Sequence, residues 1–179
     1  MQTVVEFQGG ARASSNALPK FTADDLARLS LAELRELYEG GRLFDLDRLR
    51  GAPKGRMLTL AGGLGKPTPR RVLARLAKGA LFPWRGKSFR TLDQANQRGA
   101  GINRVILLGD RFPFDTFIEA SAIDGKPCVR LDYDKPENPF FIRVIRDELR
   151  EVAEDLYLGP AMFDGKRPEL VLWFAIDCR

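Results

Sequence analysis

A series of strand-length apolar runs, separated by short turn sequences, constrains the fold of this chain more than any other feature. Runs with the length and residue types of β-strands lie at 105–108, 112–122, 128–133, 156–163 and 170–176. Asp124-Gly125 is a hairpin signal of the type I′ kind, and Asp164-Gly165 marks a second tight turn. Strands that follow one another this closely pair with their sequence neighbours, so the sequence predicts an antiparallel meander.

The stretch from Phe140 to Val152 allows two interpretations. Asn138-Pro139 could begin a helix that buries Phe141, Ile145, Leu149 and Val152. Alternation is typical of a strand instead, with Ile145, Asp147, Leu149 and Glu151 on one face. We favour a helical turn that passes into a strand.

Residues 1–20 are interpreted as a flexible N-terminal segment, and residues 21–179 as a single β-barrel-like domain with N-terminal helices. Thr22 to Asp25 and Ser30 to Glu33 are capping boxes, each with a hydroxyl at a helix start and an acid three residues later. Leucines at helical spacing follow each box, and Gly40-Gly41 ends the second helix. We expect two short helices that dock on the rest of the fold.

The region from 51 to 67 is rich in glycine and proline. Gly62 to Lys66 suggests a phosphate loop, but Leu60 stands where that motif needs glycine and Pro67 where it needs Ser or Thr. We therefore expect a loop there, after a short strand at 57–60. The pattern predicts a basic amphipathic helix at 68–79 and a further short helix at 91–98.

The chain has no histidine, which excludes whole classes of chemistry. Neither a Ser-His-Asp nor a Cys-His nucleophile system can be built, and any general acid or base must be Asp, Glu, Lys, Tyr or Cys. The two cysteines, Cys128 and Cys178, show no metal-binding spacing, so we expect no metal and no cofactor. We also expect a cytoplasmic protein, because the sequence shows neither a secretory signal nor an apolar run long enough to cross a bilayer.

Charge is distributed unevenly along the chain, whose net charge is +5. Residues 42–104 contain 15 Lys and Arg against 3 Asp and Glu, whereas the remainder is acidic. A basic region of this kind can attract nucleic acid or an anionic surface. It can equally be a solvated face or pair internally with the acidic half, which is the interpretation we favour.

Three short motifs lie in the C-terminal half: Asp132-Tyr133-Asp134, Leu156-Tyr157-Leu158-Gly159 and Leu172-Trp173-Phe174-Ala175. With them, the region of about residues 45–177 resembles an uncharacterised bacterial family that joins a GXWXG-type motif to a C-terminal domain of unknown function. A Trp-x-Gly-Lys-x-Phe element is similar to Trp84 through Phe89, and the GXWXG frame to Gly51 through Gly55, with Pro53 in place of Trp. The histidine-proline pair that members often carry is absent. The resemblance implies a lipocalin-like antiparallel barrel and assigns no catalytic residues.

Candidate ligand-binding residues are aromatic side chains for a barrel interior and polar side chains for its mouth. They are Trp84, Asn103, Arg104, Phe114, Asp132, Tyr133, Asn138, Arg143, Tyr157 and Trp173. Each aromatic residue could instead simply fill the core, and the Asp and Asn residues could bond their own turns. Tyr133 and Arg143 could orient a ligand head group, while Trp84 could plug a barrel end or anchor the core.

The fold class expected is α+β and mainly β: an antiparallel lipocalin-like β-barrel or half-barrel with short N-terminal helices. We favour a non-enzymatic protein that binds a small apolar or amphipathic ligand in the barrel, with any acidic head group met by Arg104 or Arg143. One alternative is an isomerase- or cyclase-type enzyme that uses Asp132 or Asp134 with Tyr133. Another is binding of nucleic acid or an anionic surface through residues 42–104.

Overall fold

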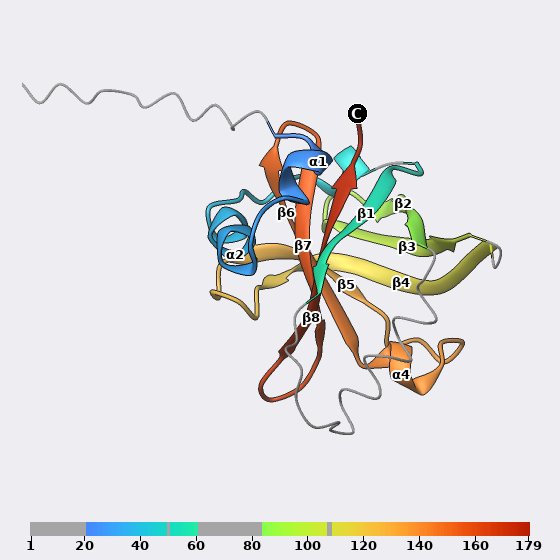
Figure 1. Cartoon of the computed structure of the whole chain (residues 1–179). Helices are drawn as coiled ribbons and strands as arrows, with labels where there is room; N and C mark the ends of the chain where they lie inside the picture. The colour runs from blue at the N-terminus through green and yellow to red at the C-terminus, as the bar shows by residue number, and fades with distance from the viewer. Residues whose placement is uncertain (1–20, 50, 61–83, 107–108) are drawn as a thin grey trace, which may run out of the picture.

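The residues that the structure describes, 21–49, 51–60, 84–106 and 109–179, form a closed barrel of eight antiparallel strands (Figure 1). In this computed structural model each strand pairs with the next in sequence, and the last pairs with the first. The strands are β1 (Lys54–Leu60), β2 (Trp84–Asp93), β3 (Arg98–Val105), β4 (Gly109–Ala120), β5 (Pro127–Asp132), β6 (Ile145–Ala153), β7 (Leu156–Phe163) and β8 (Glu169–Asp177). The expected mainly β, lipocalin-like barrel with short N-terminal helices is confirmed.

The pairing of β1 with β8 closes the barrel. Lys54 lies opposite Asp177, and Leu60 lies opposite Leu172, so β1 runs beside β8 from its first residue to its last. On its other side β1 pairs with β2 at Lys54 and Gly86, and a bridge between Gly51 and Phe89 extends this contact. Closure leaves every described strand with a neighbour on both sides, which removes the exposed edges of an open sheet.

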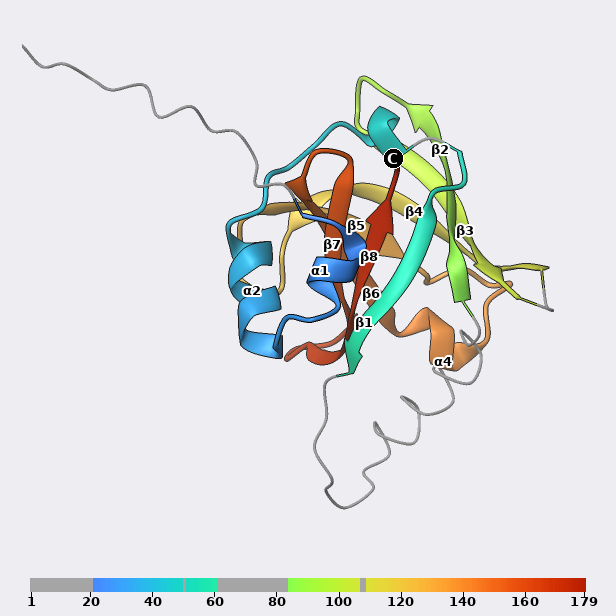
Figure 2. The same ribbon diagram turned by 45° about the horizontal axis from the view of Figure 1, so that its top comes forward.

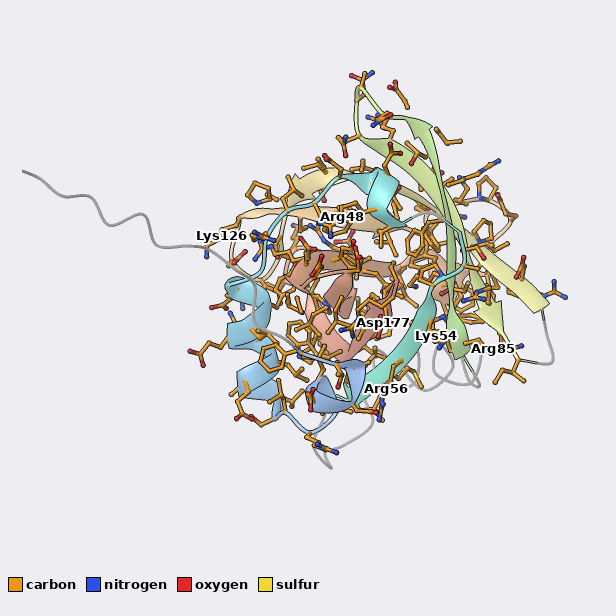
Figure 3. All side chains as sticks on the ribbon, turned by 90° about the horizontal axis from the view of Figure 1, so that it is seen from above. Arg48, Lys54, Arg56, Arg85, Lys126 and Asp177 are labelled. Carbon is orange, nitrogen blue, oxygen red and sulfur yellow. The ribbon has the colours of Figure 1, made fainter. Side chains whose placement is uncertain are left out.

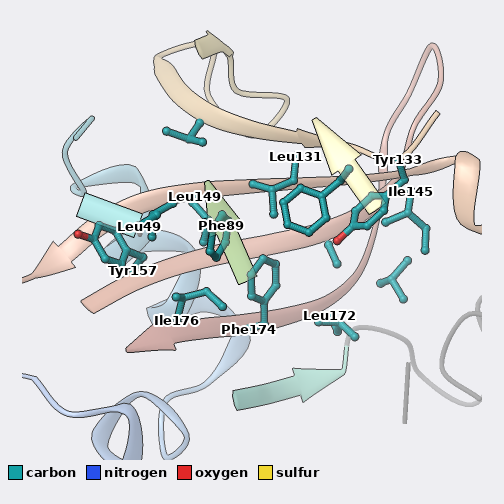
Figure 4. Close-up of a cluster of buried hydrophobic side chains, with 14 of the residues drawn as sticks. Leu49, Phe89, Leu131, Tyr133, Ile145, Leu149, Tyr157, Leu172, Phe174 and Ile176 are labelled. Carbon is teal, nitrogen blue, oxygen red and sulfur yellow. The ribbon is translucent and has the colours of Figure 1, made fainter. Parts of the chain in front are cut away.

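Alternate residues of the strands point inward and fill the barrel with apolar side chains (Figure 4). Aromatic rings contact one another across the interior, with the ring centroids of Phe89 and Phe114 5.6 Å apart and those of Phe114 and Tyr133 5.3 Å apart. The buried interior cluster includes Leu49, Phe89, Phe114, Leu131, Tyr133, Ile145, Leu149, Tyr157, Phe163, Leu172, Phe174 and Ile176.

Two helices, α1 (Ala23–Leu26) and α2 (Leu31–Glu39), cover part of the outer wall of the barrel (Figure 2). Leu26, Leu34 and Tyr38 form a second apolar cluster with outward-facing residues of β6, β7 and β8. Trp173 lies at its centre, with its ring centroid 5.5 Å from that of Tyr38. This cover explains why β6 and β7 are buried on both faces.

Both capping boxes form as the sequence indicates. The Ser30 hydroxyl accepts from the Glu33 backbone N–H at 3.3 Å, and the Glu33 carboxylate accepts from the Ser30 N–H at 2.8 Å. Thr22 and Asp25 repeat this arrangement. The second helix ends at Gly40, as expected.

The ambiguous stretch before β6 also follows the favoured interpretation. A single helical turn, α4 (Phe140–Arg143), leads into β6, and a short 3-10 helix, η1 (Leu46–Leu49), precedes β1. Pro139 rather than Asn138 stands at the start of α4. The Asn138 side-chain amide instead donates to the carbonyl oxygens of Tyr133 and Pro113, each at 2.8 Å, and so holds the preceding turn.

The helix expected at 91–98 is wrong, because these residues form the hairpin between β2 and β3. The Asp93 carboxylate accepts from the Asn96 backbone N–H at 3.1 Å and from the Asn96 amide at 2.7 Å, which tightens the turn. Gln97 adopts a positive φ of 49°, which a helix does not allow. These two local features reverse the chain.

The strand expected from Val105 starts earlier and ends at that residue. Gly99 and Gly101 both lie inside β3. A Cβ atom on Gly101 would overlap the Phe114 ring, and one on Gly99 would overlap the Thr116 hydroxyl. The glycines thus provide space for the inward side chains of β4.

The turn at Asp124-Gly125 is longer than the two-residue hairpin that was expected. The last paired residues are Ala120 and Pro127, so six residues form the loop. Asp124 accepts from the Arg150 guanidinium at 2.7 and 2.8 Å, which holds the loop against β6. Two other expectations, the flexible segment at 1–20 and the basic helix at 68–79 with the loop before it, lie outside the described residues.

Candidate functional site

Four polar side chains gather inside the apolar barrel, each from a different part of the chain. Lys87 comes from β2, Asn103 from β3, Tyr133 from the residue after β5, and Asp147 from β6. Each is at most 4% exposed. Burial of an ammonium and a carboxylate at this depth is costly unless both groups are paired and hydrogen-bonded.

The Lys87 ammonium has a partner for each of its three N–H groups. Its Nζ lies 2.8 Å from Asp147 Oδ2 and 2.8 Å from Asn103 Oδ1, and it also donates to the Tyr133 hydroxyl oxygen. The ion pair with Asp147 provides the countercharge that a buried ammonium requires. Lys87 is therefore held in one position.

The neighbouring polar groups complete the network. The Tyr133 hydroxyl donates to Asp147 Oδ2 at 2.9 Å. The Asn103 amide nitrogen donates to the Tyr133 hydroxyl and to the Phe112 carbonyl, both at 3.2 Å. Trp84 Nε1 donates to Asn103 Oδ1 at 3.1 Å. Phe112 has a positive φ of 58° and lies at a β-bulge, where the register between β3 and β4 shifts. The bulge turns the Phe112 carbonyl toward Asn103.

Four aromatic rings surround the same ammonium. Lys87 Nζ lies 5.2 Å from the ring centroids of Phe114, Tyr133 and Phe174, and 5.3 Å from that of Trp84. The negative faces of aromatic rings attract a cation, and this attraction is stronger where water is excluded. The barrel thus stabilises the charge of Lys87 both through its ion pair and through its aromatic wall.

Burial changes the acid–base behaviour of this network. Desolvation lowers the pKa of Lys87, and the neighbouring Asp147 carboxylate opposes that shift. Burial raises the pKa of Tyr133 well above its usual value, and the charge of Asp147 adds to the effect. Tyr133 is consequently a neutral phenol that donates a hydrogen bond at physiological pH.

One oxygen of the network has no partner within the described residues. Asp147 Oδ1 is buried and accepts no hydrogen bond from the protein, whereas Oδ2 accepts from both Lys87 and Tyr133. Asp147 lies on the wall of a small pocket of about 30 Å³. The other wall residues are mostly apolar: Met57, Trp84, Lys87, Asn103, Ala161, Leu172 and Phe174.

The structure brings four of the ten candidate residues to this network or its aromatic wall: Trp84, Asn103, Phe114 and Tyr133. Tyr157 also lies inside the barrel, but toward the end opposite Tyr133 (Figure 4). Its ring packs against Phe44 with centroids 4.3 Å apart.

The other candidates lie elsewhere. Arg104 points outward from β3 and donates to the carbonyl oxygens of Ala52 and Pro53. Arg143 forms an exposed ion pair with Asp134 at 2.7 Å. Neither arginine lines the pocket beside Asp147, where a ligand head group was expected to meet one of them.

Alternation along the strands accounts for two further placements. Asp132 and Tyr133 are consecutive, so the tyrosine points inward while Asp132 lies 3.6 Å from Arg130 on the outer side. Trp173 likewise points outward, under α1 and α2, because its neighbours Leu172 and Phe174 point inward. Asn138 is committed to its turn, as described above.

Sequence reasoning missed Lys87 and Asp147, the two charged residues of the site. Both had a recognisable signal. Asp147 alternates with the inward residues Ile145 and Leu149, and Lys87 belongs to the Trp84–Phe89 element on which the family resemblance depends.

The basic residues of the 42–104 region do not form one free cationic patch in the described part of the chain. Arg42 and Arg48 both pair with Glu151, at 3.4 and 2.6 Å, and Arg56 pairs with Asp24. Figure 3 shows Arg48, Arg56 and Arg85 well apart from one another. These pairings support the interpretation that the basic region is partly neutralised by acidic residues.

The described residues contain no group of three or more Cys, Asp and Glu residues placed to hold a metal ion. None of the helices in this part of the chain is long and apolar enough to span a bilayer.

Comparison with known proteins gives no family for the chain. No family model matches the sequence, and no curated protein matches it. One solved structure, described as a protein from Thermomonospora curvata, aligns at 21% sequence identity with a TM-score of 0.47. The alignment covers 83% of this chain and 87% of that chain. The barrel described above is defined by the strand pairing of this chain.

Proposed function

We propose that the barrel binds one end of a small, largely apolar molecule in the pocket beside Asp147. The observation that carries this proposal is the unpartnered Oδ1 of Asp147, a residue of a mostly apolar pocket wall. A buried acceptor without a donor costs about 1–3 kcal/mol, so a ligand that supplies the donor gains both affinity and orientation. Ligand sites typically combine apolar walls with a few placed polar groups in this way.

The size of the pocket limits what it can hold. Aromatic and aliphatic side chains fill most of the interior, and about 30 Å³ is left at the site. A cavity needs about 10–15 Å³ to hold one water molecule, so this space fits about two water-sized groups. The proposal therefore concerns the end group of a ligand rather than a whole ligand enclosed in the barrel.

Native mass spectrometry of the purified protein tests this proposal. We expect an adduct of a small organic molecule that is lost when the protein is denatured. Ala161 lines the pocket, so the Ala161→Leu variant fills the space and should carry no adduct. Leu92 is exposed on β2, away from the pocket, and Leu92→Ser serves as the matched control that keeps the adduct. Absence of an adduct from the wild type, or its persistence in Ala161→Leu, would contradict the proposal.

We also propose that the chain is a member of the GXWXG-type family that it resembles. The two N-terminal elements of that resemblance are neighbours in the barrel, which supports the proposal. Gly51 bridges to Phe89, and Gly55 packs so closely on Gly86 and the Trp84 ring that a side chain there would overlap both. An alignment of family sequences tests this membership. Independent variation at the positions that align with Gly55 and Trp84 would count against it.

Acid–base catalysis is a second candidate function, and one observation favours it. A carboxylate that lines a cavity is hydrogen-bonded to a phenol, the pairing expected of an isomerase without histidine, but the carboxylate is Asp147 rather than Asp132 or Asp134. Asp147 Oδ1 would take a proton from a carbon beside a carbonyl group, leaving the electron pair of the C–H bond in an enolate. In a β,γ-unsaturated carbonyl compound the enolate is conjugated with the double bond, so return of the proton to the γ-carbon would shift that double bond and complete an isomerisation.

Hydrogen bonding within the network places this candidate second. The N–H groups of Lys87 and the O–H of Tyr133 already have acceptors, so within the described cluster none is free to meet an enolate oxygen. Deuterium exchange at the methyl carbon of acetone in D₂O, followed by NMR, tests the candidate directly, because its CH₃–C=O end matches the size of the pocket. Faster exchange with the wild type than with Asp147→Asn would establish catalysis, and equal rates would reject it.

A further inference from the structure

We propose that the buried end of the ligand is an uncharged hydrogen-bond donor, such as a hydroxyl or a primary amide. This inference rests on the proposed ligand-binding function and names the chemical class that the site accepts. It follows from three properties of the site: its unused hydrogen-bonding capacity, its charge balance and its size.

The network leaves an acceptor unused, not a donor. Lys87 Nζ donates to Asp147, Asn103 and Tyr133, which accounts for all its hydrogens. The Tyr133 hydroxyl gives its hydrogen to Asp147 Oδ2, and the Asn103 amide hydrogens have acceptors in Phe112 and Tyr133. Asp147 Oδ1 is the remaining unsatisfied atom of this described cluster. A ligand must therefore bring a hydrogen to it, and an ether or a ketone oxygen would not do so.

The charge of the site is already balanced. Lys87 and Asp147 form a closed ion pair, and their side chains are 4% and 6% exposed. An anionic end group would face Asp147 without a free cation, since Arg104 and Arg143 lie elsewhere. A cationic end group would lie beside the Lys87 ammonium and would leave water without a countercharge of its own. A neutral donor avoids both costs.

The available volume agrees with a small end group. Room for about two water-sized groups corresponds to a hydroxymethyl unit, with the carbon against the apolar wall and the oxygen at Asp147. Ala161, Leu172 and Phe174 form that apolar wall. The same space is too small for a ring bearing a substituent.

Titration with matched ten-carbon probes tests the inference. The chain has two tryptophans, so the Trp173→Phe variant leaves Trp84, a pocket wall residue, as the sole tryptophan whose fluorescence reports binding. The probes are 1-decanol and its isomer 1-methoxynonane, which differ in the hydrogen-bond donor, together with decanoate at pH 8. We expect 1-decanol to bind about tenfold or more tightly than the ether, because the ether leaves Asp147 Oδ1 unpartnered. Decanoate should not bind.

The possible outcomes separate this inference from the function on which it rests. Equal affinity for alcohol and ether would show that the barrel binds apolar molecules but that Asp147 Oδ1 is satisfied by a water, which overturns the inference alone. Tighter binding of decanoate would also overturn it. Failure of all three probes to perturb Trp84 would overturn the proposed pocket itself.

A location control completes the test. The outer face of β2, β3 and β4 carries a groove of about 640 Å³ that includes Leu92 and Ile102, and apolar probes could adsorb there. Leu92→Ser should leave the affinity for 1-decanol unchanged, whereas Ala161→Leu should abolish binding. The reverse pattern would assign the probe to the outer groove and overturn the inference.

Discussion

Lys87 Nζ and Asp147 Oδ2 lie 2.8 Å apart in the interior of the barrel, although 60 residues separate them in the sequence. Each of these charges is buried among aromatic and aliphatic side chains that cannot solvate it. The pair therefore ties β2 to β6 across the barrel and at the same time fixes the orientation of the Asp147 carboxylate. Its second oxygen is the atom around which the proposed site is built.

Replacing Lys87 by Met should destabilise the protein by about 3–5 kcal/mol, because Asp147 would be left as an uncompensated buried charge. Urea denaturation measures this loss. The double variant Lys87→Met with Asp147→Leu should recover much of it, since an apolar pair suits this interior. Arg35→Met, which removes an exposed pair with Glu39, is the control and should cost less than about 1 kcal/mol. A cost for Lys87→Met as small as that of the control would contradict the account.

Glu148, the residue after Asp147, holds α2 against the outer wall. Its carboxylate is fully buried and accepts from the Tyr38 hydroxyl at 2.8 Å, the Ser121 hydroxyl at 2.5 Å and the Arg146 guanidinium at 2.7 Å. Glu148→Leu should cost about 3–5 kcal/mol in thermal or urea unfolding, because Arg146 loses its buried partner. Tyr38→Phe removes one donor from the same carboxylate and should cost about 1 kcal/mol. If both variants cost the same, the carboxylate is not the anchor.

Stability at alkaline pH should depend on Cys128. Burial raises the pKa of its thiol from 9.0 to about 12, with the nearby Glu148 carboxylate adding to the shift. Between these two values the folded protein retains a proton that the unfolded chain releases, so the free energy of unfolding falls as pH rises through the window. Cys128→Ala should therefore show a shallower fall between pH 9 and pH 12, by up to about 1.4 kcal/mol per pH unit.

The control for that experiment is Cys178→Ala. The Cys178 thiol is only partly buried, and its pKa is raised to about 11. Its effect on the free energy of unfolding therefore ends at a lower pH than that of Cys128. Urea unfolding at a series of pH values measures both variants against the wild type. Parallel profiles for Cys128→Ala and the wild type would show that the thiol does not contribute.

Gly159 should be intolerant of any side chain. A Cβ atom there would overlap the backbone oxygen of Glu148 on the adjacent strand, so Gly159→Ala should destabilise the barrel by about 1–3 kcal/mol or more. Gly40 ends α2 with only ordinary contacts around it and a negative φ of −82°, and Gly40→Ala should stay within about 0.5 kcal/mol of the wild type. Circular dichroism melting compares the two, and equal effects would contradict the close approach of β6 and β7.

Much of the barrel could be predicted from alternation, and the errors have local causes. The patterns around Phe114, Leu131 and Leu158 place strands correctly, because one face of each meets the core. The helix expected at 91–98 is wrong partly because a glycine such as Gly99, which makes room for a side chain on the next strand, looks the same in the sequence as a glycine that ends a helix. The turn at Asp93 depends on one side chain bonding to Asn96, which periodicity does not reveal.

The sequence predicts only part of the candidate site, and the cause differs from that of the errors in the barrel. Aromatic and uncharged members such as Trp84, Asn103 and Tyr133 fit the expectation of an apolar interior with a polar edge. Lys87 and Asp147 do not, because an isolated charge in a strand ordinarily faces solvent. Only their proximity in space makes the burial of either one stable, and that proximity comes from the register of β2 and β6 around the closed barrel.

The ligand site beside Asp147 is best tested by titrating the Trp173→Phe protein with 1-decanol, with and without Ala161→Leu. We expect a saturable change in Trp84 fluorescence that disappears when the larger side chain of the Ala161→Leu variant fills the pocket. A response of the same size and affinity in both proteins, or no response in either, would contradict a ligand site beside Asp147.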